Sequence, residues 1–260
     1  MLPAASPAMG ARRCLSRRRA RFMPRLSAGP GELGAGMMHL VYGLPPAALV
    51  DVPPDALQLS PMLPGSQSID ALPPGSAASA ILLAPPGTIE RRAVLAQLLR
   101  ALRPGGALTA LAPKARGGTR LRHEIESLGC AVNDLPRKHY RICSAPCPEP
   151  SALSTGAMAA AIAEGAMRLQ PGLDLWTQPG LFSWDRIDEG SALLRDLLAP
   201  KASDLAGWGA DLGCGLGILS RAVLASAAVT RLEMVDLDGR AIAAARRNIS
   251  ITVICFNNYG

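Results

Sequence analysis

Aromatic residues are scarce in this sequence. Its 260 residues include three Phe, three Tyr and three Trp, although 49% of all residues are hydrophobic. The core must therefore be filled mainly by Leu, Ala, Val and Ile. Long apolar runs are also missing, because no uncharged stretch reaches the roughly 20 residues that a membrane-spanning helix requires. The sequence therefore predicts a chain that has a buried core and no membrane partner.

Paired cysteines are absent as well. The six cysteines are Cys14, Cys130, Cys143, Cys147, Cys214 and Cys255. None of them forms a CxxC pair or clusters with histidine, so neither a zinc site nor a disulfide framework is indicated. We expect reduced thiols in the cytoplasm and no bound metal.

Positive charge is concentrated in residues 1–36. This segment holds seven arginines and one acidic residue, Glu32, so it carries six of the seven net positive charges. It could bind RNA phosphates, be an Arg-rich transit peptide, or precede a true start at Met37 or Met38. Because "MMHLVYGLPP" opens the first ordered-looking stretch, we favour a disordered arm or a misassigned start.

Strand and helix patterns alternate in the first half of the chain. Short strands between turns are predicted at 48–52 and 56–59, and buried strands at 79–84 and 107–112. A helix capped by Thr88 carries leucines at helical spacing. The segment "TRLRHEIESLG" predicts a second helix with a C-terminal glycine turn. Two strands, "CAVNDL" and "HYRICSA", complete an α/β order.

The pattern resumes after a connection at 148–170 that is first Pro-rich and then Ala-rich. A strand is predicted at 173–177, followed by a helix through Leu198 that Asp188 or Ser191 caps. "WGADLG" predicts a strand that leads through a glycine loop into a helix from about residue 217 to 227. "RLEMVD" predicts the next strand, and "DGRAIAAARRNI" the helix after it.

The stretch "ADLGCGLGIL" holds three alternating glycines, Gly213, Gly215 and Gly217. A dinucleotide fingerprint needs its third glycine one position later, where Ile218 stands. The P-loop pattern also fails, because no Lys-Ser/Thr pair follows. A glycine loop at a helix N-terminus can still present backbone N–H groups to a carboxylate.

Two acidic residues flank this loop. Asp211 lies just before it and could accept a hydrogen bond from a ligand's ammonium group. Asp236 ends the next predicted strand, where it could accept two hydrogen bonds from a ribose diol. An amino-acid carboxylate and amine combined with a ribose diol describe S-adenosylmethionine, which is therefore the predicted cofactor.

These residues carry a family resemblance. "DLGCGLG" followed by "EMVDLDGRAIAAARRN" resembles the first two motifs of class I S-adenosylmethionine-dependent methyltransferases. The upstream block "PGLFSWDRIDEGSALLRDLL" is similar to that of the ribosomal RNA small subunit methyltransferase C family, which are bacterial guanine-N2 methyltransferases. The resemblance covers about residues 79–248. It implies an α/β fold of two tandem Rossmann-like domains, and "LRALRPGGALTALAPKARGG" fits a degenerate first domain without cofactor.

The resemblance also implies a domain organisation. A basic arm spans 1–36, a degenerate methyltransferase-like domain 37–147, a linker 148–170, and the N-terminal part of the S-adenosylmethionine-binding domain 171–260. The implied activity is N2-methylation of a guanine in small-subunit rRNA, by a cytoplasmic monomer whose partner is rRNA or the 30S ribosomal subunit.

Eight residues are implied to bind the cofactor. They are Asp211, Gly213, Cys214, Gly215, Gly217, Asp236, Phe182 and Asp188. Phe182 could instead belong to the core, and Asp188 could be only a helix cap. No catalytic acid, base or nucleophile is assigned, because in-line placement of the amine matters more than acid–base strength.

The sequence departs from the family's pattern beyond Asp236. The family's Asn-Pro-Pro-aromatic segment, which would hold the target amine and stack on the base, is not found there. Ala, Pro, Arg and Leu also disappear from the composition after Ser250. A frameshift, a contig end or an early stop would explain both. We therefore expect an incomplete second domain with an unpaired strand edge and weak or no activity.

Other functions remain open at this point. Permuted DNA methyltransferases place their target-base segment before the glycine loop, and "LLAPPGT" contains Pro-Pro there. However, Ala84 has no side-chain acceptor and Gly87 cannot stack, so this segment is interpreted as a degenerate remnant. A non-catalytic RNA- or ribosome-binding remnant and a methyltransferase of another substrate are the alternatives. Ile218 disfavours an NAD-linked oxidoreductase.

Overall fold

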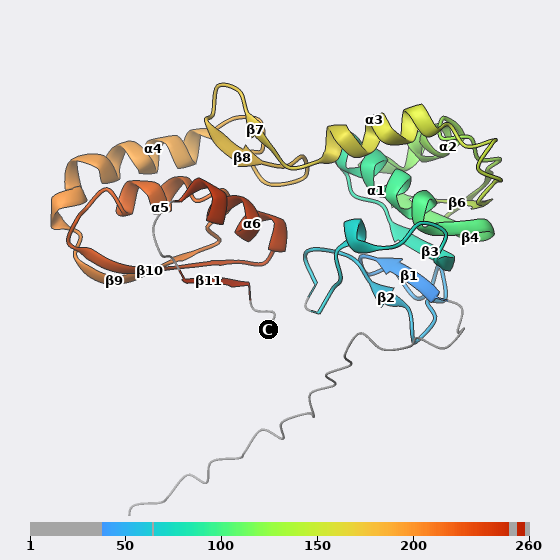
Figure 1. Cartoon of the computed structure of the whole chain (residues 1–260), viewed down its shortest axis with the longest axis horizontal. Helices are drawn as coiled ribbons and strands as arrows, with labels where there is room; N and C mark the ends of the chain where they lie inside the picture. Colours follow the sequence, from blue (N-terminus) through green and yellow to red (C-terminus); the bar gives the residue numbers. More distant parts are fainter. Residues whose placement is uncertain (1–37, 64, 250–253, 258–260) are drawn as a thin grey trace, which may run out of the picture. The chain divides into compact units, whose positions relative to one another are not determined.

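The computed structural model describes residues 38–63, 65–249 and 254–257 (Figure 1). The predicted basic arm and the change of composition at Ser250 lie outside the described residues. The fold class is α/β, as the sequence predicts. Within the described ranges, no helix is long and apolar enough to cross a membrane.

The first sheet has six strands in the order β2-β1-β3-β4-β6-β5. Strands β1 to β4 pair in parallel, and β6 is antiparallel to both β4 and β5. Its elements in chain order are β1 (Met38–Tyr42), β2 (Leu57–Gln58), β3 (Ala77–Leu83), α1 (Thr88–Ala101), β4 (Leu102–Pro113), α2 (Gly118–Glu126), β5 (Asn133–Arg137) and β6 (Tyr140–Pro146). Helix α1 is therefore the crossover between the parallel strands β3 and β4.

The first half differs from the sequence prediction at three places. Residues 48–49 lie in a turn and residues 50–52 have no regular secondary structure, so the predicted strand is absent there, and a strand forms instead at β1. Strand β4 includes the Pro-Gly-Gly segment that was expected to precede it, because Gly105 and Gly106 exchange hydrogen bonds with Cys147. The N-cap of α1 is Gly87 rather than Thr88.

Leu and Ala side chains form the core of the first sheet, as the shortage of aromatic residues requires. Leu40, Leu82 and Leu98 are fully buried in one cluster that joins the strands to α1. Helix α3 (Thr155–Gly165), which lies within the predicted linker, packs on α1 and contributes Ala161 to the same cluster.

The second group of elements begins with an antiparallel hairpin, β7 and β8, and continues with a parallel sheet in the order β11-β10-β9. Helices α5 and α6 both contact β10 (Figure 1). The bounds are β7 (Arg168–Gln170), β8 (Leu175–Thr177), α4 (Glu189–Leu198), β9 (Gly207–Leu212), α5 (Ile218–Val223), β10 (Val229–Asp236), α6 (Gly239–Asn248) and β11 (Ile254–Asn257).

Helix α5 ends earlier than the sequence predicts. Ser226 lies in the segment expected to be helical, but its hydroxyl donates to the Leu205 carbonyl at 2.7 Å and accepts from the Ala228 amide at 3.3 Å. Serine side chains that bond to nearby backbone in this way compete with helix formation. The helix therefore stops at Val223.

A buried ion pair ties α1 to α2. The Nε and Nη2 atoms of Arg91 each donate to the Glu124 carboxylate at 2.6 Å. Nη1 donates to the carbonyls of Pro85 and Pro86, and Nη2 also reaches the Thr88 hydroxyl. The side chains of Arg91 and Glu124 are only 1% and 7% exposed. Because the guanidinium is fully hydrogen-bonded, its charge is compensated inside the core.

Replacing Glu124 by Ala should lower the free energy of unfolding by about 3–5 kcal/mol, because it leaves an uncompensated buried charge. Urea denaturation of the variant measures this. Glu126→Ala on the same helix is the matched control, since it removes the exposed Arg122–Glu126 pair and should have little effect. Equal losses in the two variants would show that the burial of the Arg91 pair carries no special penalty.

Candidate functional site

The glycine loop connects β9 to α5 at the carboxyl end of the parallel sheet. Gly213, Gly215 and Gly217 have φ angles of 80°, 53° and 81°, a left-handed conformation that only glycine adopts at little cost. A Cβ added at Gly213 or Gly215 would meet no atom within 4 Å. The loop therefore faces open space at the sheet edge where open α/β sheets bind ligands.

Gly217 has a different role from the other two glycines. A Cβ at this position would lie 2.9 Å from Ile249 Cδ1 and 3.5 Å from Ala245 Cβ. The loop thus packs tightly against the C-terminal part of α6. The Cys214 side chain belongs to the same buried cluster, with Met234, and so it faces the core rather than the open side of the loop.

The backbone N–H groups of the loop are largely used within the protein. Gly213 and Cys214 both donate to the Val235 carbonyl, at 2.8 and 3.0 Å. Gly215 donates to Asp236 Oδ2 at 2.8 Å. These donors were expected to face a ligand carboxylate, but a tight turn must first satisfy its own backbone groups. The loop offers close backbone approach to a ligand rather than these donors.

The two predicted acids lie on either side of the loop. Asp236 accepts hydrogen bonds on both oxygens, from Gly215 and from the Asp238 amide at 2.9 Å. Asp211 Oδ2 accepts a hydrogen bond from Ser220 Oγ at 2.5 Å. Both carboxylates are half-buried. Because each carboxylate oxygen can accept more than one hydrogen bond, both acids retain acceptor capacity for a ligand.

Phe182 and Asp188 lie between β8 and α4. Phe182 is 76% exposed, which excludes the alternative that it belongs to the core. Asp188 is the N-cap of α4, and its Oδ1 accepts from the amides of Gly190 and Ser191 at 3.1 Å. Hydrogen bonds from Ser191 hold the pKa of Asp188 below its usual range. The structure shows the cap, and a role of these two residues in cofactor binding stays a prediction.

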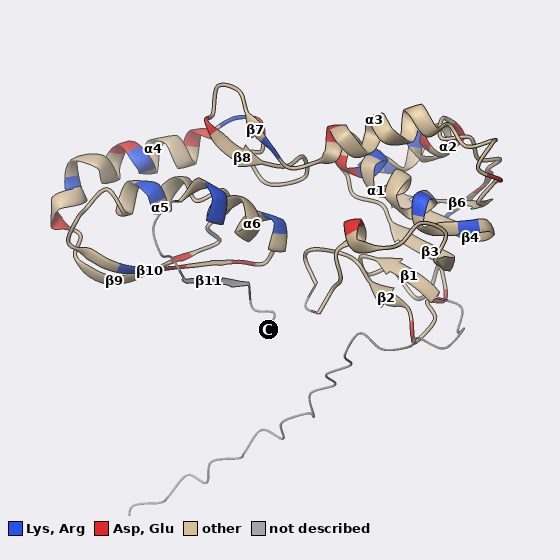
Figure 2. Ribbon diagram, in the orientation of Figure 1, with Lys and Arg blue, Asp and Glu red and all other residues tan. Residues whose placement is uncertain are grey.

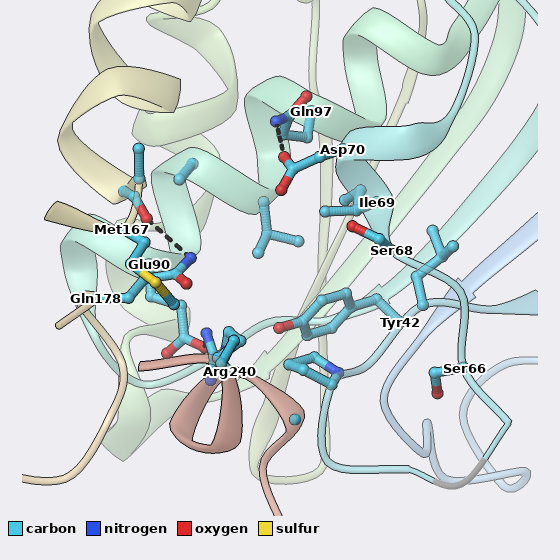
Figure 3. A pocket seen from close by; sticks show the side chains of 18 of the residues that line it. Tyr42, Ser66, Ser68, Ile69, Asp70, Glu90, Gln97, Met167, Gln178 and Arg240 are labelled. Atoms are coloured by element: carbon cyan, nitrogen blue, oxygen red, sulfur yellow. Dashed lines mark hydrogen bonds and ion pairs between the residues drawn. The ribbon is translucent and has the colours of Figure 1, made fainter. Parts of the chain in front are cut away.

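A pocket of about 1000 Å³ opens at the carboxyl end of β1. None of the eight predicted site residues lines it. Its walls come from Tyr42, residues on α1 and α3, the segment after β2, and the start of α6. Figure 3 shows the side chains of Tyr42, Glu90 and Arg240 turned toward one another at one end of this pocket.

Arg240 joins two carboxylates at this end of the pocket. Its Nη1 donates to Glu90 Oε1 at 2.7 Å, and its Nη2 donates to Asp238 Oδ2 at 2.7 Å. Glu90, Asp238 and Arg240 have side chains only 11%, 12% and 15% exposed. Burial raises the pKa of Glu90 above its usual value even though Arg240 lowers it, and the Asp238 charge adds to the rise. Burial also raises the pKa of the Tyr42 hydroxyl.

Sequence reasoning missed Glu90 and Arg240. The signal for them is weak but physical, because Arg240 stands in the first turn of α6, where a cation opposes the helix dipole. Figure 2 shows basic residues near both ends of this helix. A cation at the N-terminal end of a helix indicates carboxylate partners, and the structure shows a local one, Asp238, and a distant one, Glu90.

Comparisons with known proteins find methyltransferases to which this chain is similar. The family model of the methyltransferase small domain matches residues 172–254. A ribosomal RNA small subunit methyltransferase C from Pseudomonas paraeruginosa is 30% identical over 201 residues, which are 74% of this chain and 57% of that protein. The Salmonella arizonae protein of the same name is 38% identical over 80 residues, covering 31% of this chain and 22% of its own length.

A solved structure has the same fold. It is the T. thermophilus 16S rRNA N2 methyltransferase in complex with AdoMet and guanosine, which matches with a TM-score of 0.60 at 20% identity. The match covers 78% of this chain and 54% of that one. The present chain thus spans little more than half the length of the P. paraeruginosa and T. thermophilus proteins.

Replacing Gly217 by Ala should lower the free energy of unfolding by about 2 kcal/mol, from left-handed strain and from crowding against Ile249. Gly172→Ala is the matched control, because Gly172 has a φ of 86° but a Cβ added there would meet no atom within 4 Å. Thermal or urea unfolding should show a smaller loss for Gly172→Ala. Equal losses would reject the packing role of Gly217.

The stability contribution of Glu90 should depend on pH. A raised pKa means that Glu90 holds its proton more tightly in the folded protein, so its contribution is full below about pH 4 and is lost as pH rises through the raised pKa. The side chain in Glu90→Gln cannot ionise, so the free energy of unfolding of this variant has no such loss as pH rises. Urea unfolding from about pH 4 to pH 8 should therefore show the variant gaining stability relative to the wild type. A variant that becomes relatively less stable with rising pH would contradict this.

Proposed function

Because this chain belongs to the ribosomal RNA small subunit methyltransferase C family, we propose that it is an S-adenosylmethionine-dependent methyltransferase that acts on the exocyclic N2 of a guanine in small-subunit rRNA. The observation that carries the proposal is the hydrogen bond from Gly215 to Asp236, which places an acid of β10 against the glycine loop of β9. The partner is rRNA or the 30S subunit, and the reaction belongs in the cytoplasm.

The residues around the loop fit S-adenosylmethionine. The open space at Gly213 and Gly215 allows a ligand to approach the backbone closely. Asp236 has acceptor capacity for ribose hydroxyls, and Asp211 has it for the amino group. When bound, S-adenosylmethionine supplies an electrophilic methyl group.

In such a reaction the protein would mainly orient the cofactor and the target amine relative to each other. Asp211 and Asp236 would hold the two polar ends of the cofactor, so that the methyl group has one orientation. The Cys214 thiol lies in the buried cluster behind the loop, and we assign it no part in the transfer. The target amine must reach the methyl carbon in line, which requires orientation of the base more than an acid or a base.

We also propose that residues 37–147 are a degenerate methyltransferase-like domain, that 148–170 connect the domains, and that 171–260 are the N-terminal part of the cofactor-binding domain. In support, parallel strands with crossover helices occur in both the first sheet and the β9–β11 sheet. After β1 the chain reads Gly43, Leu44, Pro45, Pro46. The loop after β1 therefore lacks the alternating glycines that follow β9.

Calorimetric titration of the 260-residue chain with S-adenosylmethionine tests the proposal directly. We expect binding by the wild type, and affinity weakened at least about tenfold by Asp236→Asn, because a charge-assisted acceptor of the ribose is lost. Asp196→Ala is the control, since Asp196 is exposed on α4 and pairs with its neighbour Arg195. A wild type that binds no S-adenosylmethionine would overturn the proposed function.

Transfer itself is measured by incubating the chain with 30S subunits and isotopically labelled S-adenosylmethionine, followed by mass spectrometry of the rRNA nucleosides. Label in N2-methylguanosine supports the guanine assignment. Label in another nucleoside would keep the methyltransferase assignment and reject guanine N2 as the target.

A further inference from the structure

A continuous set of contacts runs from α1 to the glycine loop. Glu90 accepts a hydrogen bond from Arg240, and Arg240 donates to the Asp238 carboxylate through both Nε and Nη2. The Asp238 amide donates to Asp236 Oδ1 at 2.9 Å, and the Gly215 amide donates to Asp236 Oδ2 at 2.8 Å. Both oxygens of the proposed ribose-binding acid are therefore held by groups that belong to this set of contacts.

Two further contacts hold the start of α6 and the side chain of Glu90. The Gly239 amide donates to the Pro61 carbonyl, in the segment after β2, at 3.0 Å. The backbone at Gly180, with φ of 102°, approaches Glu90 so closely that an added Cβ would overlap its carboxylate. Glu90 is thus enclosed by the Gly180 turn on one side and by Arg240 on another.

This arrangement is not explained by stability. Burial raises the pKa of Glu90, so keeping it ionised in the folded protein has a cost. Arg240 also stands where its charge opposes the dipole of α6. Buried ion pairs often contribute no more stability than apolar side chains of similar volume would. The contact is better explained by what it holds in place, which is the turn between β10 and α6.

We propose that Glu90 is a positioning residue for the cofactor site, and that it acts through Arg240 and Asp238 to fix the placement of Asp236 and of the glycine loop. Helix α1, which connects two strands of the six-stranded sheet, would thereby set the geometry of a site on the β9–β11 sheet. The identity of the ligand rests on the proposed function, whereas the positioning of the loop does not.

Hydrogen–deuterium exchange without any ligand tests the positioning. Glu90→Ala should speed amide exchange over residues 213–217 at least severalfold, with exchange in the core of α1 and β4 unchanged. Arg240→Ala should do the same, and the double variant should add nothing, because both residues act through one contact. Glu126→Ala, which removes an exposed carboxylate on α2, is the matched control. Unchanged exchange over 213–217 in Glu90→Ala would overturn the proposal.

If Glu90→Ala speeds exchange throughout the chain, the variant is globally destabilised and Glu90→Gln decides. This change keeps the shape of the side chain and removes its charge. Faster exchange confined to residues 213–217 would support the proposal, and wild-type exchange there would overturn it.

The affinity for S-adenosylmethionine separates failure of this inference from failure of the proposed function. Well below the melting temperature, Glu90→Ala should raise Kd about tenfold in the wild-type background and leave it unchanged in the Arg240→Ala background. If the wild type binds and neither Kd nor loop exchange responds to Glu90→Ala, the positioning role fails and the function stands. If the wild type does not bind, the function fails and the exchange experiment still decides the positioning role.

Discussion

The hydrogen bond between the Gly215 amide and the Asp236 carboxylate is the contact on which the candidate site depends. Strands β9 and β10 pair in parallel, with Leu212 opposite Val235, so both strands end at the same edge of the sheet. The loop after one strand therefore meets the acid at the end of the other. The left-handed conformation of Gly215 lets its amide turn toward Asp236, which is why a glycine is needed there.

Two neighbouring residues on α1, Glu90 and Arg91, carry ionisable groups into the protein interior and contact different parts of the structure. Consecutive positions on a helix point about 100° apart, so Glu90 and Arg91 face different partners. Arg91 bonds to Glu124 within the first sheet's own layers, where its guanidinium is fully hydrogen-bonded. Glu90 instead meets Arg240, 150 residues away in the sequence. The Arg91–Glu124 pair lies in the core beside the six-stranded sheet, and the Glu90–Arg240 pair links α1 to α6, which contacts β10.

Local patterns account for much of the fold. Leucines at helical spacing predict α1, and Gly129 predicts the turn that follows α2, where its φ is 102°. The strand–loop–helix unit around β9 and the helix capped by Asp188 are likewise local features. The structure differs from the sequence prediction where hydrogen-bond partners lie far apart in the sequence. Gly105 and Gly106 belong to β4 because they bond to Cys147, and Ser226 ends α5 early because it bonds to Leu205.

The sequence by itself determined the order of the site: an acid, three alternating glycines, a helix, and a second acid at the end of the next strand. These features are local, because φ restrictions and strand periodicity act over a few residues. Only the tertiary structure decided that the loop amides donate hydrogen bonds to the β10 backbone and to Asp236, and that Cys214 faces the core. It also decided that Arg240 pairs with Glu90 on α1. Such contacts follow from packing between segments distant in the sequence, because Asp238 is a local partner of Arg240 whereas Glu90 reaches it only through the fold.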